Sequence, residues 1–351
     1  MGDTFVSFET DVAGPLVASA ADAALARADE LAAAGRCLDA IDVLRGVRAE
    51  DGDPNVDRRL TALRHQAFRE LAASDEPRPA PLTPAPSPVP AGTLAEIEPA
   101  ELTAAVVRRA IEGCGGLLVR GLLADHVDQL VHGIDTAFAA RERGRGEHAG
   151  AWYHPLWLER AKAQSLGRNW IAGGSALLAC DSPRVVNDVL DLYEQIGLRR
   201  VVNEYLQERP VLSANKCTLR HVPPESGTDW HQDGAFLGKG IKALNVWVAL
   251  TDCGIDAPGL DLVPLRLDDV LPTGTGGAYF DWAVGPEVVA GLEDRAPVVR
   301  PTFRAGDVML FDELFLHRTA VDEAMTERRY AIEAWFFAPS AYPSGQVPLV
   351  W

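Results

Sequence analysis

Two histidines and an aspartate carry the clearest chemical signal in the sequence. His231 and Asp233 stand two residues apart in WHQDG, residues 230–234, and His317 follows in LFLHRTAV. Alternate side chains of a strand share one face, so a histidine from a distant strand could complete a three-ligand site. Two imidazoles and one carboxylate leave three positions open on iron(II), enough for a chelating co-substrate and O2. Alone the pattern is weak, because a histidine beside an aspartate is often only a hydrogen-bonded pair.

An arginine pair strengthens this interpretation. GDVMLFDELFLH places His317 at the end of a strand entered through a Gly-Asp turn, and Arg328 and Arg329 follow on the next expected strand. A guanidinium there can form a bidentate pair with the distal carboxylate of a keto acid whose other end chelates the metal. The two arginines point in opposite directions along a strand, so only one can face the interior.

The elements that must position these residues are short strands. From Pro210 onward the chain is a series of β-branched and aromatic segments separated by Gly, Pro and Asp: VLSANKCTLRHV, ALNVWVAL, GLDLVPL, PVVRPTF, GDVMLF and RYAIEAWFFA. Helical spacing precedes them at residues 101–112, 124–140, 183–196 and 198–207, with an apolar run at 116–121. We expect an α+β, mainly β fold, a double-stranded β-helix (a cupin-like jelly roll) buttressed by flanking helices.

The N-terminal part has a different texture. Residues 16–73 are rich in alanine and leucine at helical spacing, and ELAAAGRCLDAIDVL resembles the helical hairpin of a tetratricopeptide repeat, without a clear second copy. Seven of the fourteen residues from 77 to 90 are proline, which excludes helix and central strand. We therefore expect a helical segment at 1–75, a linker at 76–93 and the main domain at 94–351. The helices serve either as an embellishment of that domain or as a module that binds a carrier protein or partner enzyme.

Bulk properties exclude several classes of protein. A net charge of -17, without a basic face interleaved with aromatics, argues against nucleic-acid binding. Residues 1–10 lack the signal of a secreted protein, and no long apolar run predicts a membrane span. Five scattered cysteines suggest reduced thiols. We expect a cytoplasmic protein that acts on a small molecule and has no membrane contact.

From about residue 94 to 337 the chain resembles the phytanoyl-CoA dioxygenase family of iron(II)/2-oxoglutarate oxygenases. The resemblance rests on GLLVRGLL with its flanking helices and on WHQDG, NVWVALTD, GDVMLFDELFLHRT and RRYAIEAWFF. It implies that His231, Asp233 and His317 bind iron(II). It also implies that Arg329, favoured over Arg328 by its register, anchors the C5 carboxylate of 2-oxoglutarate.

The resemblance extends to the pocket. Thr319 stands where the family often has a hydroxyl that supports the same carboxylate, and Trp247 lies on the strand that forms a pocket wall; a surface threonine and a packed core tryptophan are the alternatives. Thr218, with Lys216 and Arg220 on the same strand face, could also line the pocket. After ALTD this chain departs from the family's turn residues at positions 257–267. Inference about the substrate therefore stops at the pocket mouth.

The implied reaction is oxidation of an unactivated C–H bond, most simply hydroxylation, with release of succinate and CO2. Relatives that halogenate have a small residue in place of the carboxylate, so Asp233 argues for hydroxylation, desaturation or ring formation. The substrate would be a small molecule of secondary metabolism or an acyl group on a carrier. The alternative is a metal-binding jelly roll, an isomerase or sensor, without oxygenase activity.

Overall fold

The computed structural model describes residues 19–48, 52–72, 92–144, 150–159, 164 and 166–351. The predicted proline-rich linker lies almost wholly outside them. In the described part, no helix is long and apolar enough to cross a membrane. The helices are α1 (Ala20–Ala33), α2 (Cys37–Val47), α3 (Pro54–Ala72), α4 (Ala104–Cys114), α5 (Val127–Arg143), α7 (Arg168–Gly173), α8 (Pro183–Gln195), α9 (Leu198–Leu206), α10 (Gly234–Leu237) and α11 (Pro286–Ala290).

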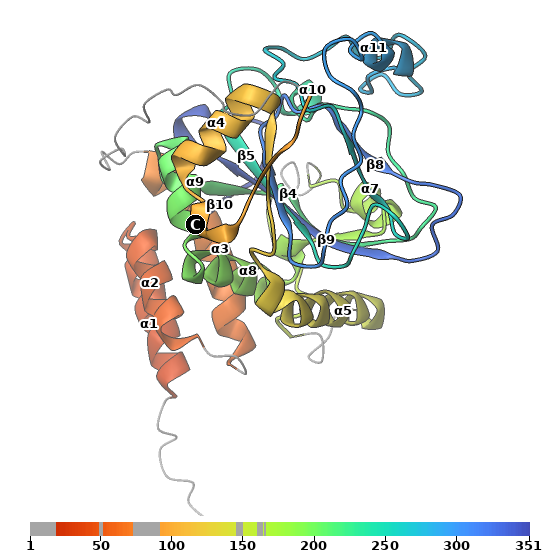
Figure 1. The fold of residues 1–351 in the computed structure, drawn as a ribbon. Coiled ribbons are helices and arrows are strands. Elements are labelled where there is room, and N and C mark those ends of the chain that lie inside the picture. The colour runs from red at the N-terminus through yellow and green to blue at the C-terminus, as the bar shows by residue number, and fades with distance from the viewer. Residues whose placement is uncertain (1–18, 49–51, 73–91, 145–149, 160–163, 165) are drawn as a thin grey trace, which may run out of the picture.

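A large sheet forms the centre of the molecule (Figure 1). Its strand order is β1-β2-β7-β5-β9-β4-β10, with β3 paired to β4, and only β1 and β2 run parallel. Strands β6 and β8 form a second, antiparallel sheet, which isolated bridges extend. The strands are β1 (Ala95–Ile97), β2 (Gly116–Val119), β3 (Ala176–Leu178), β4 (Val211–Val222), β5 (Ala243–Ala249), β6 (Gly259–Leu262), β7 (Val308–Phe311), β8 (His317–Ala320), β9 (Arg329–Phe337) and β10 (Pro348–Val350).

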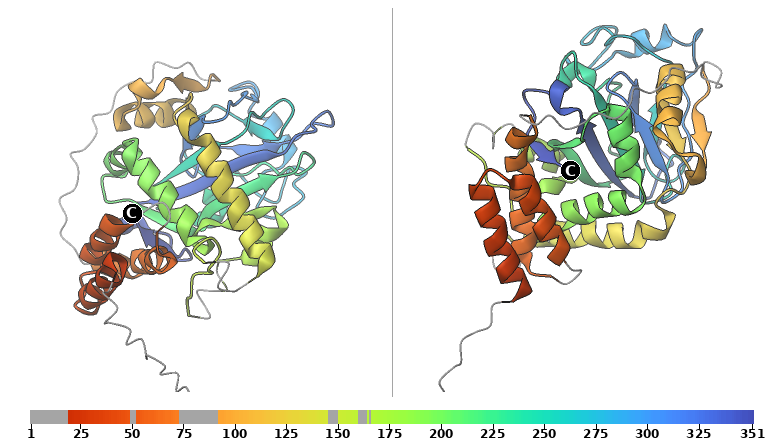
Figure 2. Two further views of the ribbon diagram at one scale, coloured as in Figure 1. Left: turned by 90° about the horizontal axis from the view of Figure 1, so that it is seen from below. Right: turned by 90° about the vertical axis from the view of Figure 1, so that its left-hand side faces the viewer.

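Alternation along the strands separates two cores. On β9, Ile332, Ala334 and Phe336 pack with α4, α5, α8 and α9, which cover one face of the large sheet (Figure 2). The opposite face presents Ala331 and Trp335 to a second cluster, which includes residues of the smaller sheet. This is the layered arrangement of a jelly roll, and it confirms the predicted fold class.

One predicted strand did not form. PVVRPTF, residues 297–303, makes only isolated bridges, from Val299 to Leu262 and from Phe303 to Cys253. Two prolines in seven residues explain this, because each removes a ladder donor. The predicted Gly-Asp turn before β7 is present: Gly306 has φ +93°, and a Cβ there would meet the backbone of Ala124 at 2.4 Å. The turn thus requires glycine.

The N-terminal helices α1–α3 pack onto the main domain beside the C-terminus (Figure 1). Their apolar cluster includes Val211 of β4 and Val350 of β10. Buried Arg64 of α3 donates from Nη1 to the carbonyl of Val350 at 2.9 Å and from Nε to Oδ1 of Asn187 at 3.0 Å. The helices predicted here are present and belong to the packed body of the protein.

Candidate metal centre

The three predicted ligands lie close together, although they differ in secondary structure. Their ligand atoms all lie within 4.8 Å of one another, and among the residues described they are the group found with metal-binding potential. His317 is the first residue of β8, and His231 faces it across an isolated antiparallel bridge. Asp233 has helical backbone angles and precedes α10. The expectation that His231 and Asp233 share a strand was therefore wrong, and a turn brings them together instead.

Reciprocal backbone bonds hold the two histidines opposite each other. The amide of His231 donates to the carbonyl of His317 at 2.9 Å, and the amide of His317 donates back at 3.1 Å. The amide of Gly234 donates to the carbonyl of Glu313 at 2.8 Å, which fixes the turn behind Asp233. A Cβ at Gly234 would meet that carbonyl oxygen at 3.1 Å, so the glycine of WHQDG permits this close approach.

The imidazoles are oriented for coordination. Nδ1 of His231 lies 2.8 Å from the carbonyl of Asp229, and Nδ1 of His317 lies 3.0 Å from the carbonyl of Phe315. With these Nδ1 atoms acting as donors, Nε2 of each ring is left as a lone-pair donor to a metal. Burial and the neighbouring His317 lower the pKa of His231 to about 4. At neutral pH its ring is therefore uncharged and able to bind a cation.

The carboxylate completes the donor set. Oδ2 of Asp233 lies 3.7 Å from Nε2 of His317, while Oδ1 lies 3.4 Å from Nζ of Lys216. Lys216 also lies over the ring of Phe236, with Nζ 3.8 Å from its centroid. Two imidazoles and a carboxylate with converging ligand atoms fit a divalent transition metal.

Arg329 lines the same cavity as His231 and Asp233. Its guanidinium is buried, and Nη1 donates at 3.0 Å to the carbonyls of both Pro258 and Gly259. Nε has no partner, and the ion pairs described for the chain include no carboxylate on Arg329. Burial lowers the pKa of Arg329 to about 10, so it stays charged at neutral pH. Arg328 is exposed, in agreement with the prediction that only one of the pair faces inward.

The other predicted pocket residues fall into two groups. Thr319 is buried on β8 and lines the cavity. Trp247 lies outside the cavity lining, and its ring centroid is 5.5 Å from Cζ of Arg329. Thr218 also lies outside the cavity lining, and its hydroxyl donates to Oε2 of Glu333 at 3.2 Å. The roles of these three in binding 2-oxoglutarate remain predictions.

The segment at 257–267 is more central than its departure from the family motif suggested. Pro258 and Gly259 supply both carbonyls that hold Arg329, and Arg266 forms an ion pair with Asp312 on the loop that leads to His317. Glycine at 259 is required, because a Cβ there would approach Gly254 to 2.6 Å. Residues 257–267 therefore hold Arg329 and the loop that precedes His317, and do not only border the mouth of the cavity.

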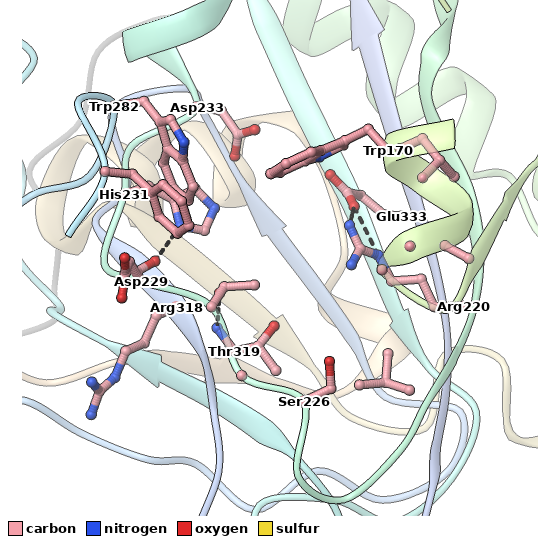
Figure 3. A pocket seen from close by; sticks show the side chains of 18 of the residues that line it. Trp170, Arg220, Ser226, Asp229, His231, Asp233, Trp282, Arg318, Thr319 and Glu333 are labelled. Atoms are coloured by element: carbon pink, nitrogen blue, oxygen red, sulfur yellow. Dashed lines mark hydrogen bonds and ion pairs between the residues drawn. The ribbon is translucent and has the colours of Figure 1, made fainter. Parts of the chain in front are cut away.

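Several cavity residues were not predicted. The cavity has a volume of about 1020 Å³, and Glu333 lies in its wall with an ion pair to Arg220 (Figure 3). Trp170, Phe280 and Trp282 also line it. The inward register of β9 could have identified Glu333, four residues after Arg329. Nothing local marks the aromatic residues, because they come from segments without a strand pattern.

Comparison with known proteins gives a family match and a set of similar solved structures. Residues 175–321 match the family model described as phytanoyl-CoA dioxygenase (PhyH), and this range holds all three candidate ligands. No curated protein matches the chain. Similar solved structures include a non-heme alpha-ketoglutarate-dependent carbocyclase, SnoK, from nogalamycin biosynthesis (15% identity, 70% of this chain and 87% of that one, TM-score 0.45).

Two further structures are similar at the same level. EctD from S. alaskensis, solved with 2-oxoglutarate and 5-hydroxyectoine, has 17% identity over 75% of this chain and 85% of that one, with a TM-score of 0.43. AviO1 from Streptomyces viridochromogenes Tue57 has 20% identity over 69% and 98%, with a TM-score of 0.42. The family match and the converging ligands agree, because residues 175–321 match the phytanoyl-CoA dioxygenase model and contain His231, Asp233 and His317.

Proposed function

We propose that this protein is an iron(II)- and 2-oxoglutarate-dependent oxygenase that hydroxylates an unactivated C–H bond of a small or carrier-bound substrate. The observation that carries the proposal is Arg329, a buried guanidinium with an unpartnered Nε, on the cavity that is also lined by His231 and Asp233. An uncompensated buried charge costs folding free energy, so its presence favours a ligand of opposite sign.

The residues divide the work between metal and co-substrate. Nε2 of His231, Nε2 of His317 and a carboxylate oxygen of Asp233 would hold the ion. Arg329, with Thr319 beside it in the cavity wall, would hold the distal carboxylate of 2-oxoglutarate. Iron(II) bound there would supply the redox chemistry that couples O2 and decarboxylation of 2-oxoglutarate to substrate oxidation, with release of succinate and CO2.

The chain's own contribution is orientation and exclusion of water. Trp247 and the carbonyls of Pro258 and Gly259 fix the guanidinium of Arg329 in one position. Phe311 packs against the ring of His317, with centroids 4.8 Å apart, and closes the inner side of the site. Lys216 holds Oδ1 of Asp233, which leaves Oδ2 toward the histidines. Fixed positions of the ligands and of Arg329 would direct the reaction to one bond.

The test measures iron binding and succinate release in the same variants. Wild type should bind iron(II) without O2 and release succinate only with both iron and 2-oxoglutarate present. His231→Ala should lose both properties. His221→Ala, which removes a histidine of β4 stacked on Tyr330, should keep both. Metal binding that survives without any use of 2-oxoglutarate would instead indicate an isomerase or sensor.

A further inference from the structure

The cavity has aromatic walls that come from two separate parts of the chain. Trp282 and Phe280 stack with ring centroids 5.2 Å apart and planes at 10°, and Trp282 meets the ring of His231 edge-on at 5.8 Å. Trp170 of α7 reaches into the cavity from the other side, with Asp233 seen between the two tryptophans (Figure 3). Trp170 is 72% exposed, so its ring is accessible to a ligand in the cavity.

Both walls are held in place by the fold. The loop of Trp282 continues into Val284, whose amide donates to the carbonyl of Trp230 at 2.8 Å, and Val284 packs in a small apolar cluster with Trp230. At the start of α7, Arg168 donates from Nε and Nη2 to the buried carboxylate of Asp181 at 2.6 and 2.7 Å. Rigid aromatic walls lose little conformational entropy when a ligand binds.

The polar part of the cavity contains charged groups of both signs. Its described lining has basic Lys216, Arg220, Arg318 and Arg329 against acidic Asp229, Asp233 and Glu333, in a chain with a net charge of -17. Iron(II) would balance the charge of bound 2-oxoglutarate. The guanidinium of Arg318 is paired with Asp261 outside this lining, so the remaining basic and acidic groups are equal in number, and the case for an acidic substituent depends on Arg220.

Arg220 is the group placed to recognise that acid. Its Nε and Nη2 donate to Glu333, which fixes the plane of the guanidinium, and the described hydrogen bonds do not use Nη1. The strand pairing places Arg220 opposite Ala331, midway between Arg329 and Glu333, and the hydrogen bonds of Arg220 direct its guanidinium to Glu333. Arg220 can therefore serve a ligand other than 2-oxoglutarate.

On the basis of the proposed function, we infer that the substrate carries a flat aromatic or conjugated ring with an acidic oxygen substituent. The ring lies between Trp170 and the Trp282–Phe280 stack, and the acidic oxygen accepts from Arg220. Contact of Trp282 with His231 then places the ring next to the metal. The cavity volume of about 1020 Å³ is sufficient for such a compound together with 2-oxoglutarate.

Three probes of similar size separate the parts of this inference: 2-naphthoate, its neutral amide, and the saturated decahydro-2-naphthoate. Calorimetry on the full chain, with iron(II), saturating 2-oxoglutarate and no O2, should give 2-naphthoate roughly tenfold tighter binding than either other probe. Equal binding of the flat and saturated acids, or no binding of any probe, would overturn the inference.

Substitutions at Trp170, Trp282 and Arg220 test which residues produce the preference for 2-naphthoate. Trp170→Ala and Trp282→Ala should each weaken 2-naphthoate by roughly tenfold. Trp157→Ala, at an exposed tryptophan outside the described lining, should change nothing. Arg220→Lys should remove the preference for the acid over the amide, because lysine keeps the charge toward Glu333 but loses the planar fork. If both cavity tryptophan variants bind like Trp157→Ala, the aromatic walls do not hold substrate.

A separate titration with 2-oxoglutarate distinguishes failure of this inference from failure of the proposed function. An iron-bound 2-oxo acid absorbs visible light by charge transfer, so its binding is seen without any substrate. If that band forms while the probes do not discriminate, only the substrate class is wrong. If it does not form, the proposed function fails, and the probes then test the aromatic walls in metal-free protein.

Discussion

Two arginines in different parts of the molecule, one with little exposed side chain and one fully buried, show two ways in which the fold accommodates a charge. Arg48, where the N-terminal helices dock, pairs with Asp57 at 2.6 Å, with Asp191 at 2.7 Å and with Asp188. Arg329, in the candidate active site, has carbonyl partners and an unpartnered Nε. The first charge is balanced by the protein and holds two parts together. The second is left for a ligand, at some cost to stability.

We expect the N-terminal helices α1–α3 to be required for folding. Removing residues 1–72 would uncover Val211 and Val350 and leave Asp188 and Asp191 without Arg48. We predict that the truncated chain is insoluble or has no cooperative thermal transition. A truncated chain that unfolds cooperatively and still binds iron would show instead that the helices are a separable module. A role of their outer surface in holding a carrier protein or partner enzyme remains a proposal.

A single substitution tests the paired arginine. Arg48→Ala removes one partner each from Asp57, Asp188 and Asp191, which keep weaker or single pairs with Arg184 and Arg45, and it should lower the free energy of unfolding by about 3 kcal/mol. Urea denaturation measures this directly. Arg27→Ala, which breaks an exposed pair with Glu30, should cost less than about 0.5 kcal/mol. Similar costs at the two positions would mean that Arg48 does not fasten the helices.

Glu313, on the loop between β7 and β8, makes the free energy of unfolding depend on pH. Burial and the neighbouring Asp312 raise the pKa of Glu313 to about 7. The folded protein therefore keeps a proton that the unfolded chain releases, and this stability is present below pH 4.5 and lost as pH rises through 7. Between pH 5 and 8 the loss should be about 2 kcal/mol. Urea denaturation of Glu313→Gln should lack it, whereas exposed Glu323→Gln should retain it.

The unpaired arginine should contribute least to stability. In Arg329→Leu, loss of the bonds to Pro258 and Gly259 offsets relief of a buried charge, so we expect the free energy of unfolding to change by less than about 1 kcal/mol. Urea denaturation of metal-free protein is the measurement. A loss as large as that of Arg48→Ala would mean that Arg329 is structural, and the contrast between the two arginines would disappear.

Sequence patterns predicted the strands around the site, but they did not predict the backbone conformation at His231 and Asp233. The inward direction of Arg329 follows from strand alternation, and β9 kept that alternation over its whole length. The same rule failed for His231 and Asp233, because a bridge and a turn replace the strand there. The bond from Gly234 to the carbonyl of Glu313 fixes that turn, and periodicity cannot reveal a contact between segments so far apart.

The sequence did not predict the aromatic walls of the cavity, for a similar reason. Trp170 lies on the short helix α7 and Trp282 in a loop, and the position of α7 depends on the Arg168–Asp181 pair. No local pattern links these segments before the chain has folded. The buried network of Arg48 was equally hidden, since its partners lie on α3 and α8.

The account depends most on Arg329 as the receptor of 2-oxoglutarate. Calorimetric titration of 2-oxoglutarate into iron-loaded protein without O2 compares wild type with Arg329→Leu and Arg328→Leu. We predict that wild type and Arg328→Leu bind alike and that Arg329→Leu binds roughly 100-fold more weakly with its iron affinity unchanged. Equal affinity in all three proteins, or no binding to iron-loaded wild type, would contradict the account.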